Sequence, residues 1–273
     1  PEEDTETTIP IEDIGMVVLD HPQITLTHSV TEALLEENAA LITCDKKHLP
    51  VGLLLPLCGN TTQTERMREQ LNASLPLKKQ LWQQTVSAKI NNQACLLEKR
   101  GVIAKNMRVW AKNVKSGDAE NLEGRAAAYY WKNAFPSLPD FTREREGIFP
   151  NSVLNYGYAL LRGIAARALV SSGLLPTFGI FHRNKYNAYC LADDVMEPYR
   201  PYIDALVMQL YEDGLCGEEI DKATKIKLLQ IPVLDVEING KRSPLMVAMT
   251  TTTASLQKCY AGEARRIIYP EMK

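Results

Sequence analysis

The stretch 152–172 constrains the fold of this 273-residue chain more than any other part of it. Its side chains would be apolar nearly all the way round a helix, and Gly173 and Pro176 follow it directly. A helix without a polar face must be covered by other elements on every side, and Gly and Pro end helices. The sequence therefore predicts one central, buried helix with the remaining elements packed around it.

The first 60 residues differ in character from the rest of the chain. Short runs rich in β-branched residues predict strands, and they lie at 8–12, 15–20, 24–27, 40–45 and 51–57. A short helix is expected at 29–38, where Ser29 as N-cap and Glu32 at the third helical position form a capping-box pattern.

From residue 61 onward the sequence is typical of long helices. Helical spacing of apolar residues covers 62–75, 77–98, 105–116 and 121–134, and another helix is expected to run to about residue 211. The stretch 58–62 is the expected linker. The predicted fold class is therefore α+β, with a small β-rich domain over residues 1–60 and a larger all-α domain over residues 61–273.

The last part of the chain predicts a hairpin followed by a helix. Residues 233–238 resemble a strand, and Asn239-Gly240 is the dipeptide expected of a tight hairpin turn. Ser243-Pro244 then suits the N-cap and first position of a final helix reaching about residue 268.

Charge, cysteine content and hydropathy argue against several classes of protein. The net charge of −2 gives no global basic signature, so local patches would have to hold any anionic partner. The six cysteines lie far apart without zinc spacing, which favours free buried thiols in a reducing cytoplasm. No uncharged run reaches the ~18 apolar residues of a membrane span, and the acidic start of the chain does not resemble a secretory signal. We expect a cytoplasmic protein with no membrane partner, and native residues upstream of Pro1.

Residues 179–204 carry the groups with the clearest chemical meaning. His182 is followed by the acidic cluster Asp193, Asp194 and Glu197, and the last two would share a helical face. Crowded carboxylates repel one another unless a cation lies between them. A histidine with carboxylates and no nearby thiolate suits Mg²⁺ or Mn²⁺ better than zinc. The alternative is a solvated, acidic helix start that Asp193 or Asp194 caps.

Two prolines directly follow this acidic cluster. Pro198 has no N–H for the carbonyl of Asp194, and Pro201 has none for that of Glu197. The helix is therefore expected to kink or restart here, which would help to aim the carboxylates at an ion.

Glu123 begins a helix that should otherwise be mostly buried. It follows the candidate N-cap Asn121 and precedes the small and aromatic residues GRAAAYYW. An acid in such a place needs a partner or a function. The alternative is a glutamate that only compensates the helix dipole, which stabilises by about 0.5 kcal/mol.

Basic residues occur in separate patches. The spacing of Lys105, Arg108, Lys112 and Lys115 places them on one helical face that could follow a phosphate backbone, although most such runs are merely solvated. The further candidates for phosphate contacts are Arg183 and Lys185 beside His182, and Lys241 and Arg242 at the hairpin tip.

Several long segments resemble one protein family. They are NLEGRAAAYYWKNAFP (121–136), LNYGYALLRGIAARALVSSGLLPTFGIFH (154–182) and YNAYCLADDVMEPYRPYID (186–204), together with 8–25 and 241–271. These segments closely resemble the universal CRISPR adaptation integrase, in the version found in type II systems. The resemblance covers nearly the whole chain.

The resemblance implies a fold and a metal site. In this family an N-terminal β domain mediates homodimerisation and a C-terminal helical domain is catalytic. The glutamate of the family's EG-x-AA motif falls on Glu123, its histidine on His182, and the acid of its D-x-x-E motif on Glu197. These three would be the catalytic residues and would hold Mg²⁺ or Mn²⁺. Asp194 is expected as an auxiliary ligand, and Asp193 as a cap.

The reaction that the resemblance implies is a metal-assisted transesterification on DNA. The 3′-hydroxyl of a foreign DNA fragment would attack a phosphodiester of the CRISPR repeat, while Arg183, Lys185, Lys241 and Arg242 contact phosphates near the site. Water in place of that hydroxyl would make the site an endonuclease on branched or single-stranded DNA. The implied partner protein is a small ferredoxin-like dimer that bridges two integrase dimers. The alternatives are a structure-specific repair endonuclease with the same residues and a DNA-binding scaffold without catalysis.

Overall fold

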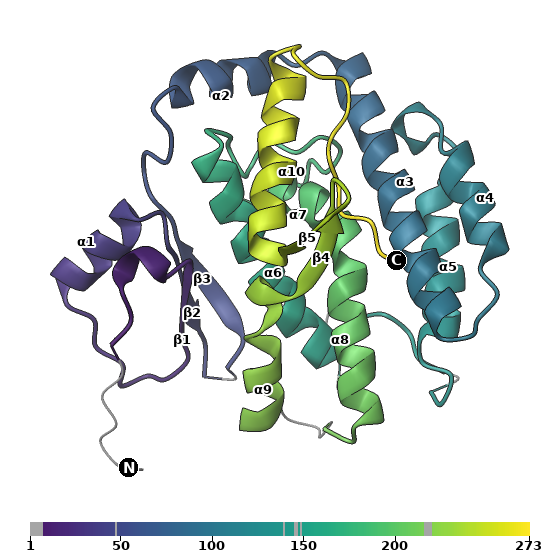
Figure 1. The fold of residues 1–273 in the computed structure, drawn as a ribbon, viewed down its shortest axis with the longest axis horizontal. Coiled ribbons are helices and arrows are strands. Elements are labelled where there is room, and N and C mark those ends of the chain that lie inside the picture. The colour runs from purple at the N-terminus through teal and green to yellow at the C-terminus, as the bar shows by residue number, and fades with distance from the viewer. Residues whose placement is uncertain (1–7, 47, 139, 145–146, 148, 216–219) are drawn as a thin grey trace.

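Helix α6 (Asn151–Ser171) lies at the centre of the fold. The structure is a computed structural model that describes residues 8–46, 48–138, 140–144, 147, 149–215 and 220–273 (Figure 1). The apolar residues of α6 are almost all buried, and the helix contacts β2 and β3 as well as α7, α8 and α10. The central buried helix predicted for 152–172 is thereby confirmed.

Two glycines allow close packing against α6. A Cβ atom placed on Gly163 would lie 2.8 Å from Cδ1 of Ile42 in β2. One placed on Gly157 would lie 2.5 Å from Cγ2 of Ile203 in α8. Because interiors are close-packed, the sheet and α8 can approach the helix backbone only where a side chain is missing.

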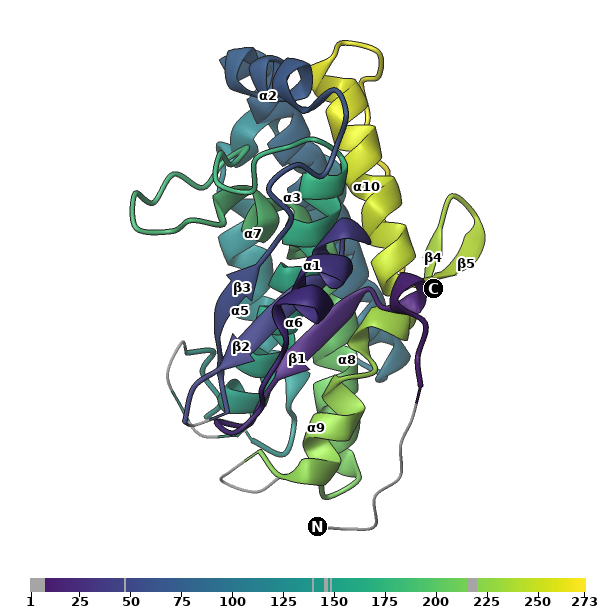
Figure 2. The ribbon, with the colours of Figure 1, turned by 90° about the vertical axis from the view of Figure 1, so that its left-hand side faces the viewer.

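A small sheet covers one side of α6 (Figure 2). Its strands are β1 (Met16–Leu19), β2 (Ala40–Cys44) and β3 (Pro50–Leu54). Strand β1 is parallel to β2, and helix α1 (His28–Glu36) connects the two. Strand β2 pairs with β3 in the antiparallel direction. Ile42 of β2 belongs to the same core as the helices that follow. The predicted division of the chain at residue 60 stays a prediction.

Three details of the N-terminal prediction are wrong. Residues 8–12 contain a short 3-10 turn (η1, Ile11–Asp13) in place of a strand, and 24–27 have no regular structure. The helix cap is Thr27, whose hydroxyl accepts from the N–H of Val30 at 3.3 Å. Thr27 has the extended backbone that an N-cap requires, whereas Ser29 already lies inside the helix.

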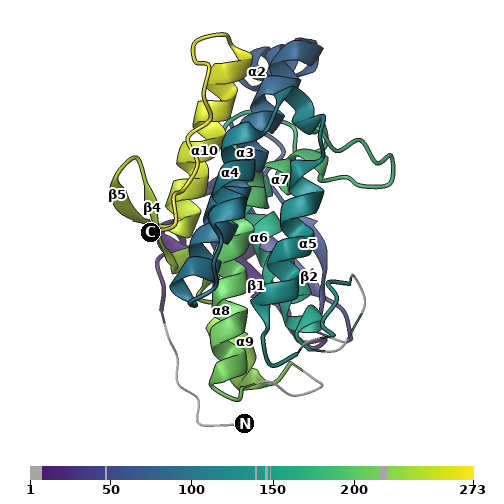
Figure 3. The same cartoon turned by 90° about the vertical axis from the view of Figure 1, so that its right-hand side faces the viewer.

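The predicted helices between 62 and 134 are confirmed to within a few residues. They are α2 (Gln63–Asn72), α3 (Leu75–Lys99), α4 (Lys105–Asn113) and α5 (Leu122–Ala134), with a 3-10 turn η2 (Ser116–Asp118) before the last. Helix α3 contacts α4, α5 and α8, and Figure 3 shows this side of the molecule. Helix α3 therefore packs not only on its neighbours in sequence but also on α8, which follows α6 in the chain.

The helix is interrupted where the prolines predicted a break. Helix α7 (Cys190–Met196) passes into a 3-10 turn, η3 (Glu197–Tyr199), and α8 (Arg200–Glu212) starts afresh. The carbonyl of Pro198 accepts a hydrogen bond from the side-chain amide of Asn92 in α3 at 2.8 Å. Pro201 has no N–H for the carbonyl of Glu197, which instead accepts from the N–H of Arg200.

The C-terminal part ends in a hairpin and a helix. It comprises α9 (Lys222–Leu228), which the sequence analysis did not predict, a 3-10 turn η4 (Ile231–Val233), β4 (Asp235–Ile238), β5 (Lys241–Pro244) and α10 (Leu245–Tyr260). The tight turn is confirmed, because Asn239 and Gly240 both have positive φ angles, 52° and 69°.

The predicted start and end of the last helix are wrong. Ser243 pairs with Val236 inside the hairpin, so it cannot cap α10, which has no side-chain cap. The helix ends at Tyr260, and Gly262 then adopts a left-handed conformation with φ 79°. The remaining tail runs back along α3, where the side chain of Gln84 accepts from the N–H of Ile267 at 2.9 Å.

Two compositional expectations can also be compared with the structure. The cysteines that the structure describes are free, although Cys58 is exposed and not buried, and Cys216 lies outside the described residues. Among the described helices, none combines the length and apolar character that a membrane crossing requires.

Candidate functional site

Glu123 and Glu197 meet on the two sides of one cation, the ammonium of Lys89. Nζ of Lys89 lies 2.7 Å from Oε1 of Glu123 and 2.6 Å from Oε2 of Glu197. The three residues come from α5, η3 and α3, three elements far apart in the sequence. Only 13% of the Lys89 side chain is exposed. The structure thus brings together two of the predicted ligands and adds a lysine that the sequence analysis did not select.

The start of α5 is built so that Glu123 stays in place. The predicted cap Asn121 is confirmed: its side chain accepts from the N–H of Gly124 at 3.2 Å. The carboxylate of Asp118 accepts from the N–H groups of Leu122 and Glu123 at 2.9 and 3.0 Å. A Cβ atom on Gly124 would lie 2.8 Å from the amide of Asn121, so a larger residue there would push the capping side chain aside.

Glu197 is a buried carboxylate between two cations. Its Oε1 lies 3.0 Å from Nη2 of Arg200, and its Oε2 contacts Lys89. That Oε2 contact is close, but its geometry does not make a hydrogen bond. Burial alone would raise the pKa of Glu197, but Arg200 and Lys89 outweigh it and lower the pKa.

His182 is held by Asp194. Its Nδ1 lies 2.5 Å from Oδ1 of Asp194, whose Oδ2 accepts from the N–H of Phe181 at 2.9 Å. Asp194 is completely buried, and its carboxylate binds the backbone and side chain of the segment that carries His182. A Cβ atom on Gly179 would lie 2.7 Å from this carboxylate, so a larger residue would push it aside. The arrangement leaves Nε2 as the ring nitrogen of His182 that could face an ion.

The pKa values of His182 and Asp194 reflect this contact. The hydrogen bond that Asp194 accepts from the imidazole raises the pKa of His182, and the charges of Glu197 and Glu123 act in the same direction. Burial raises the pKa of Asp194 although His182 opposes the shift. The pair therefore holds a proton more firmly than either group would alone. The charges of both glutamates therefore act on the imidazole of His182.

Aromatic rings and one amide fix the loop on which His182 lies. Phe181 stacks on Trp82 of α3, with 4.5 Å between ring centroids, and the ring of His182 meets Trp82 edge-on at 5.6 Å. The buried amide of Gln70 in α2 donates to the carbonyls of Leu175 and Phe178 and accepts from the N–H of Leu175. Two helices thus hold a loop that itself has no regular structure.

The donor set suits the expected ion. Among the described residues, no three His, Cys, Asp or Glu side chains converge closely enough to form a ready-made metal cage. Two carboxylates and an imidazole nevertheless match the ligands of Mg²⁺ or Mn²⁺, and the two carboxylates already share one positive charge, that of Lys89. The residues therefore fit a divalent cation.

Asp193 does not have the predicted role of a helix cap. It lies inside α7, and Tyr189 precedes the helix without capping it. The carboxylate of Asp193 pairs with Arg162 at 2.7 Å and accepts from the amide of Asn187 at 2.7 Å. This pair joins α7 to α6, because the guanidinium of Arg162 reaches the carboxylate from the neighbouring helix.

The predicted basic residues do not form one surface. Arg183 and Lys185 are exposed on the loop between α6 and α7, whereas Lys241 and Arg242 lie on the hairpin β4–β5. Figures 2 and 3 show that loop and hairpin project to opposite sides of the molecule. The expectation that all four residues contact phosphates near the site stays a prediction.

The predicted stripe along α4 is partly engaged in the protein itself. Arg108 pairs with Glu98 at 2.6 Å and donates to the carbonyl of Asn91 at 3.1 Å, so its guanidinium is bound. Lys115 lies beyond the end of α4 and pairs with Glu120. Lys105 and Lys112 are exposed, and Lys112 lines a groove of about 930 Å³ that runs between α3, α4 and the C-terminal tail.

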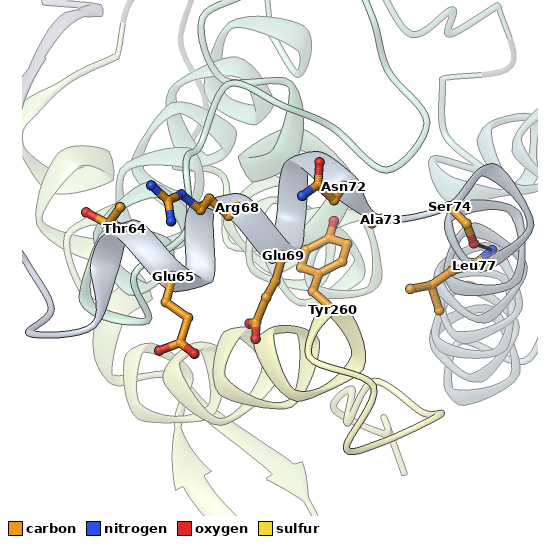
Figure 4. Close-up of a pocket in the computed structure, with 9 residues that line it drawn as sticks. All are labelled: Thr64, Glu65, Arg68, Glu69, Asn72, Ala73, Ser74, Leu77 and Tyr260. Atoms are coloured by element: carbon orange, nitrogen blue, oxygen red, sulfur yellow. Dashed lines mark hydrogen bonds between the residues drawn. The ribbon is translucent and has the colours of Figure 1, made fainter.

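A second hollow lies between α2, the start of α3 and α10 (Figure 4). It has a volume of about 700 Å³ and includes the side chains of Glu65, Arg68 and Glu69. Tyr260 also lines it, and its buried hydroxyl has no hydrogen-bond partner among the described residues. None of the predicted site residues lines this hollow.

Comparison with known proteins identifies clear relatives. The family model for CRISPR associated protein Cas1 matches residues 1–224. A CRISPR-associated endonuclease Cas1 from Neisseria meningitidis serogroup C is 37% identical over 268 residues, which covers 97% of this chain and 87% of the relative. One from Pyrobaculum aerophilum is 28% identical and covers 91% and 88%.

Several solved structures have the same fold as this chain. A casposase bound to integration product superposes with a TM-score of 0.78 at 21% identity, covering 93% of this chain and 80% of that one. A CAS1 protein from Thermotoga maritima gives a TM-score of 0.75 at 17% identity, covering 93% and 88%. A Cas6-RT-Cas1–Cas2 complex gives 0.74 at 20% identity, where the match covers 95% of this chain and 32% of the longer one. At these identities the likeness shows a shared arrangement of strands and helices, the α+β fold predicted from the sequence.

Proposed function

This chain belongs to the family of CRISPR-associated protein Cas1, and from that premise we propose that it is a metal-dependent DNA integrase with endonuclease activity. It joins the 3′-hydroxyl of a foreign DNA fragment to a phosphodiester of the CRISPR repeat, and with water in place of that hydroxyl it cleaves DNA. The observation that carries this proposal is the meeting of Glu123 and Glu197 around one cation beside His182.

Glu123, Glu197 and His182 are the residues that would hold Mg²⁺ or Mn²⁺. Bound there, the ion would supply Lewis-acid polarisation of the scissile phosphate. Asp194 orients the imidazole by its hydrogen bond to Nδ1 and does not itself act as a ligand, because both of its oxygens are occupied. Holding an imidazole by a carboxylate fixes which nitrogen faces the ion.

DNA is held by local positive charge. The exposed side chains of Arg183 and Lys185 follow His182 directly, so phosphates bound to them lie next to the reacting groups. Lys105 and Lys112 are a second, weaker set on α4, and Arg108 contributes less because Glu98 neutralises it. Lys241 and Arg242 contact DNA only where it reaches the opposite side of the molecule.

The partners follow from the relatives. One structural relative is part of a complex that contains Cas2, and we propose a small partner protein of that kind for this chain. We propose further that two copies of the chain associate through the region around β1–β3. Such an assembly would bind DNA with more positive surface than one chain of net charge −2 offers alone.

The test is the Glu123→Gln variant. It keeps the size of the side chain and removes its charge, so we expect strand joining to fall at least about 100-fold while DNA binding persists. Glu120→Gln is the matched control, because Glu120 is exposed and its carboxylate pairs with Lys115, away from the candidate site. Full strand joining by Glu123→Gln would refute the assignment, and cleavage without joining in the unaltered protein would favour the repair endonuclease.

A further inference from the structure

Lys89 is the charged residue whose position the proposed reaction does not explain. Its ammonium bridges Glu123 and Glu197, and the charge of Arg200 acts on Glu197 from the other side. With Asp194 bound to His182, the carboxylates and cations of this neighbourhood nearly balance. The ammonium of Lys89 thus offsets the repulsion between the carboxylates of Glu123 and Glu197.

This balance has a consequence for a divalent ion. An ion held by Glu123 and Glu197 would take the place of the Lys89 ammonium or lie within a few ångströms of it. Like charges at that separation repel strongly in a site shielded from water. Lys89 must therefore leave before the carboxylates can hold an ion, and its flexible four-carbon stem allows this.

The displaced ammonium needs a new counter-charge. It lies on the accessible side of the site, since 13% of its own side chain and 21% of that of Glu123 are exposed, against 6% for Glu197. The anions that arrive on that side during the proposed reaction are DNA phosphates. A phosphate can take up the ammonium that the incoming ion releases.

We propose that Lys89 is an exchangeable counterion that couples metal binding to DNA binding. In the free protein it holds Glu123 and Glu197 together and keeps metal affinity low. When DNA is bound, Lys89 moves to a phosphate and the carboxylates accept the ion. The inference rests on the proposed function, because it takes the same two glutamates as metal ligands. It also implies reciprocity: metal must tighten DNA binding by the same factor by which DNA tightens metal binding.

The experiment measures Mn²⁺ affinity calorimetrically with and without a branched DNA oligonucleotide. The Glu123→Gln variant with the same DNA measures how much Mn²⁺ binds outside the candidate site, on the DNA or elsewhere on the protein. For the unaltered protein we expect DNA to tighten Mn²⁺ binding about tenfold, a usual size for such coupling. For Lys89→Met we expect Mn²⁺ to bind about tenfold more tightly without DNA, and DNA to add little.

Two further variants sharpen the result. Lys89→Arg keeps the positive charge and places between the two carboxylates a guanidinium, which can donate to both at once. Because this group should be harder to displace, Mn²⁺ should bind more weakly, the opposite of the result expected for Lys89→Met. It also keeps the test decisive if Lys89→Met does not fold. Lys99→Met, at an exposed position of the same helix, should behave like the unaltered protein.

The outcomes separate the two proposals. If the unaltered protein and Glu123→Gln bind Mn²⁺ equally, the metal site itself is absent and both proposals fall. If Mn²⁺ binding depends on Glu123 but is the same in the Lys89 variants, or if DNA tightens it equally in all of them, Lys89 is a permanent salt bridge and only this inference is overturned.

Discussion

At the scale of single residues, Asp193 and Asp194 show how neighbours in sequence take unrelated roles. Asp194 points into the protein and binds His182, while Asp193 points toward α6 and pairs with Arg162. The sequence could place both acids on one helix but could not separate these roles, because the direction of each side chain depends on α6 and on the preceding loop.

This difference gives a first prediction. Asp194→Asn should lower the rate of strand joining by about 10- to 100-fold, the usual cost of removing a carboxylate that orients a metal-binding histidine. The asparagine amide cannot accept at both former oxygen positions, so His182 or the backbone of Phe181 loses its partner. Initial rates of joining and thermal melting measure the effect.

Asp193→Asn is the control for that variant. It changes the same group one residue away but leaves His182 untouched, so we expect joining within about twofold of the unaltered protein. Equal losses in the two variants would show that the acidic cluster acts as a whole, and no loss in either would show that Asp194 does not orient His182.

Lys89 was the important residue that the sequence did not reveal. It is one of many lysines on predicted helices, and its spacing relative to Glu123 and Glu197 carries no signal. Only the packing of α3 against α5 and η3 shows that it is buried between two acids. A lysine within the mostly apolar face of α3 was the available hint, since an unpaired charge is costly to bury.

At the scale of elements, the helices were predictable and their ends were less so. Apolar spacing predicted α2 to α5, because a helix with one buried face repeats its apolar residues about every 3.6 positions. The apolar character all the way round predicted α6. The cap predicted at Ser29 failed because Thr27, two residues earlier, supplies the capping hydroxyl. The cap predicted at Ser243 failed because that residue pairs with Val236 in the hairpin. The tail after Tyr260 was predicted as helix, although Gly262 ends it and α3 supplies its hydrogen bonds.

The cap of α5 allows a prediction at this scale. Asn121 has φ 51°, a left-handed backbone, and also caps the helix with its side chain. Asn121→Ala removes the cap and leaves a residue that resists positive φ, so the free energy of unfolding should fall by roughly 2–3 kcal/mol. Urea denaturation measures this value.

Asn121→Gly separates the two contributions. Glycine accepts the positive φ but lacks the capping oxygen, so its loss should be smaller, about 1 kcal/mol or less. If glycine and alanine destabilise equally, backbone strain plays no part at this position, and the prediction is wrong in that respect.

At the scale of the whole molecule, DNA binding would have to rely on local patches of positive charge. The chain has a net charge of −2, yet it must hold a polyanion if the proposed function is correct. The loop with Arg183 and Lys185 and the hairpin with Lys241 and Arg242 face opposite sides (Figures 2 and 3). DNA engaged at His182 therefore meets the first pair and not the second.

Salt dependence tests this geometry. Replacing Arg183 and Lys185 by alanine should reduce the slope of log affinity against log salt by about 0.9 for each lost phosphate contact. Replacing Lys241 and Arg242 by alanine should leave the slope unchanged for a DNA fragment too short to wrap the molecule. The opposite ranking of the two double variants would place the DNA on the hairpin side.

The amide of Gln70 has a consequence for how this protein can diverge. It makes three hydrogen bonds to the segment that leads to His182, as donor and acceptor at once. Glutamate would lose both donated bonds, and no other side chain of that length offers both groups. The groups that Gln70 binds belong to the backbone, which is the same whatever side chains stand there. In an alignment of relatives, position 70 should therefore keep its glutamine while the residues at 175–178 vary.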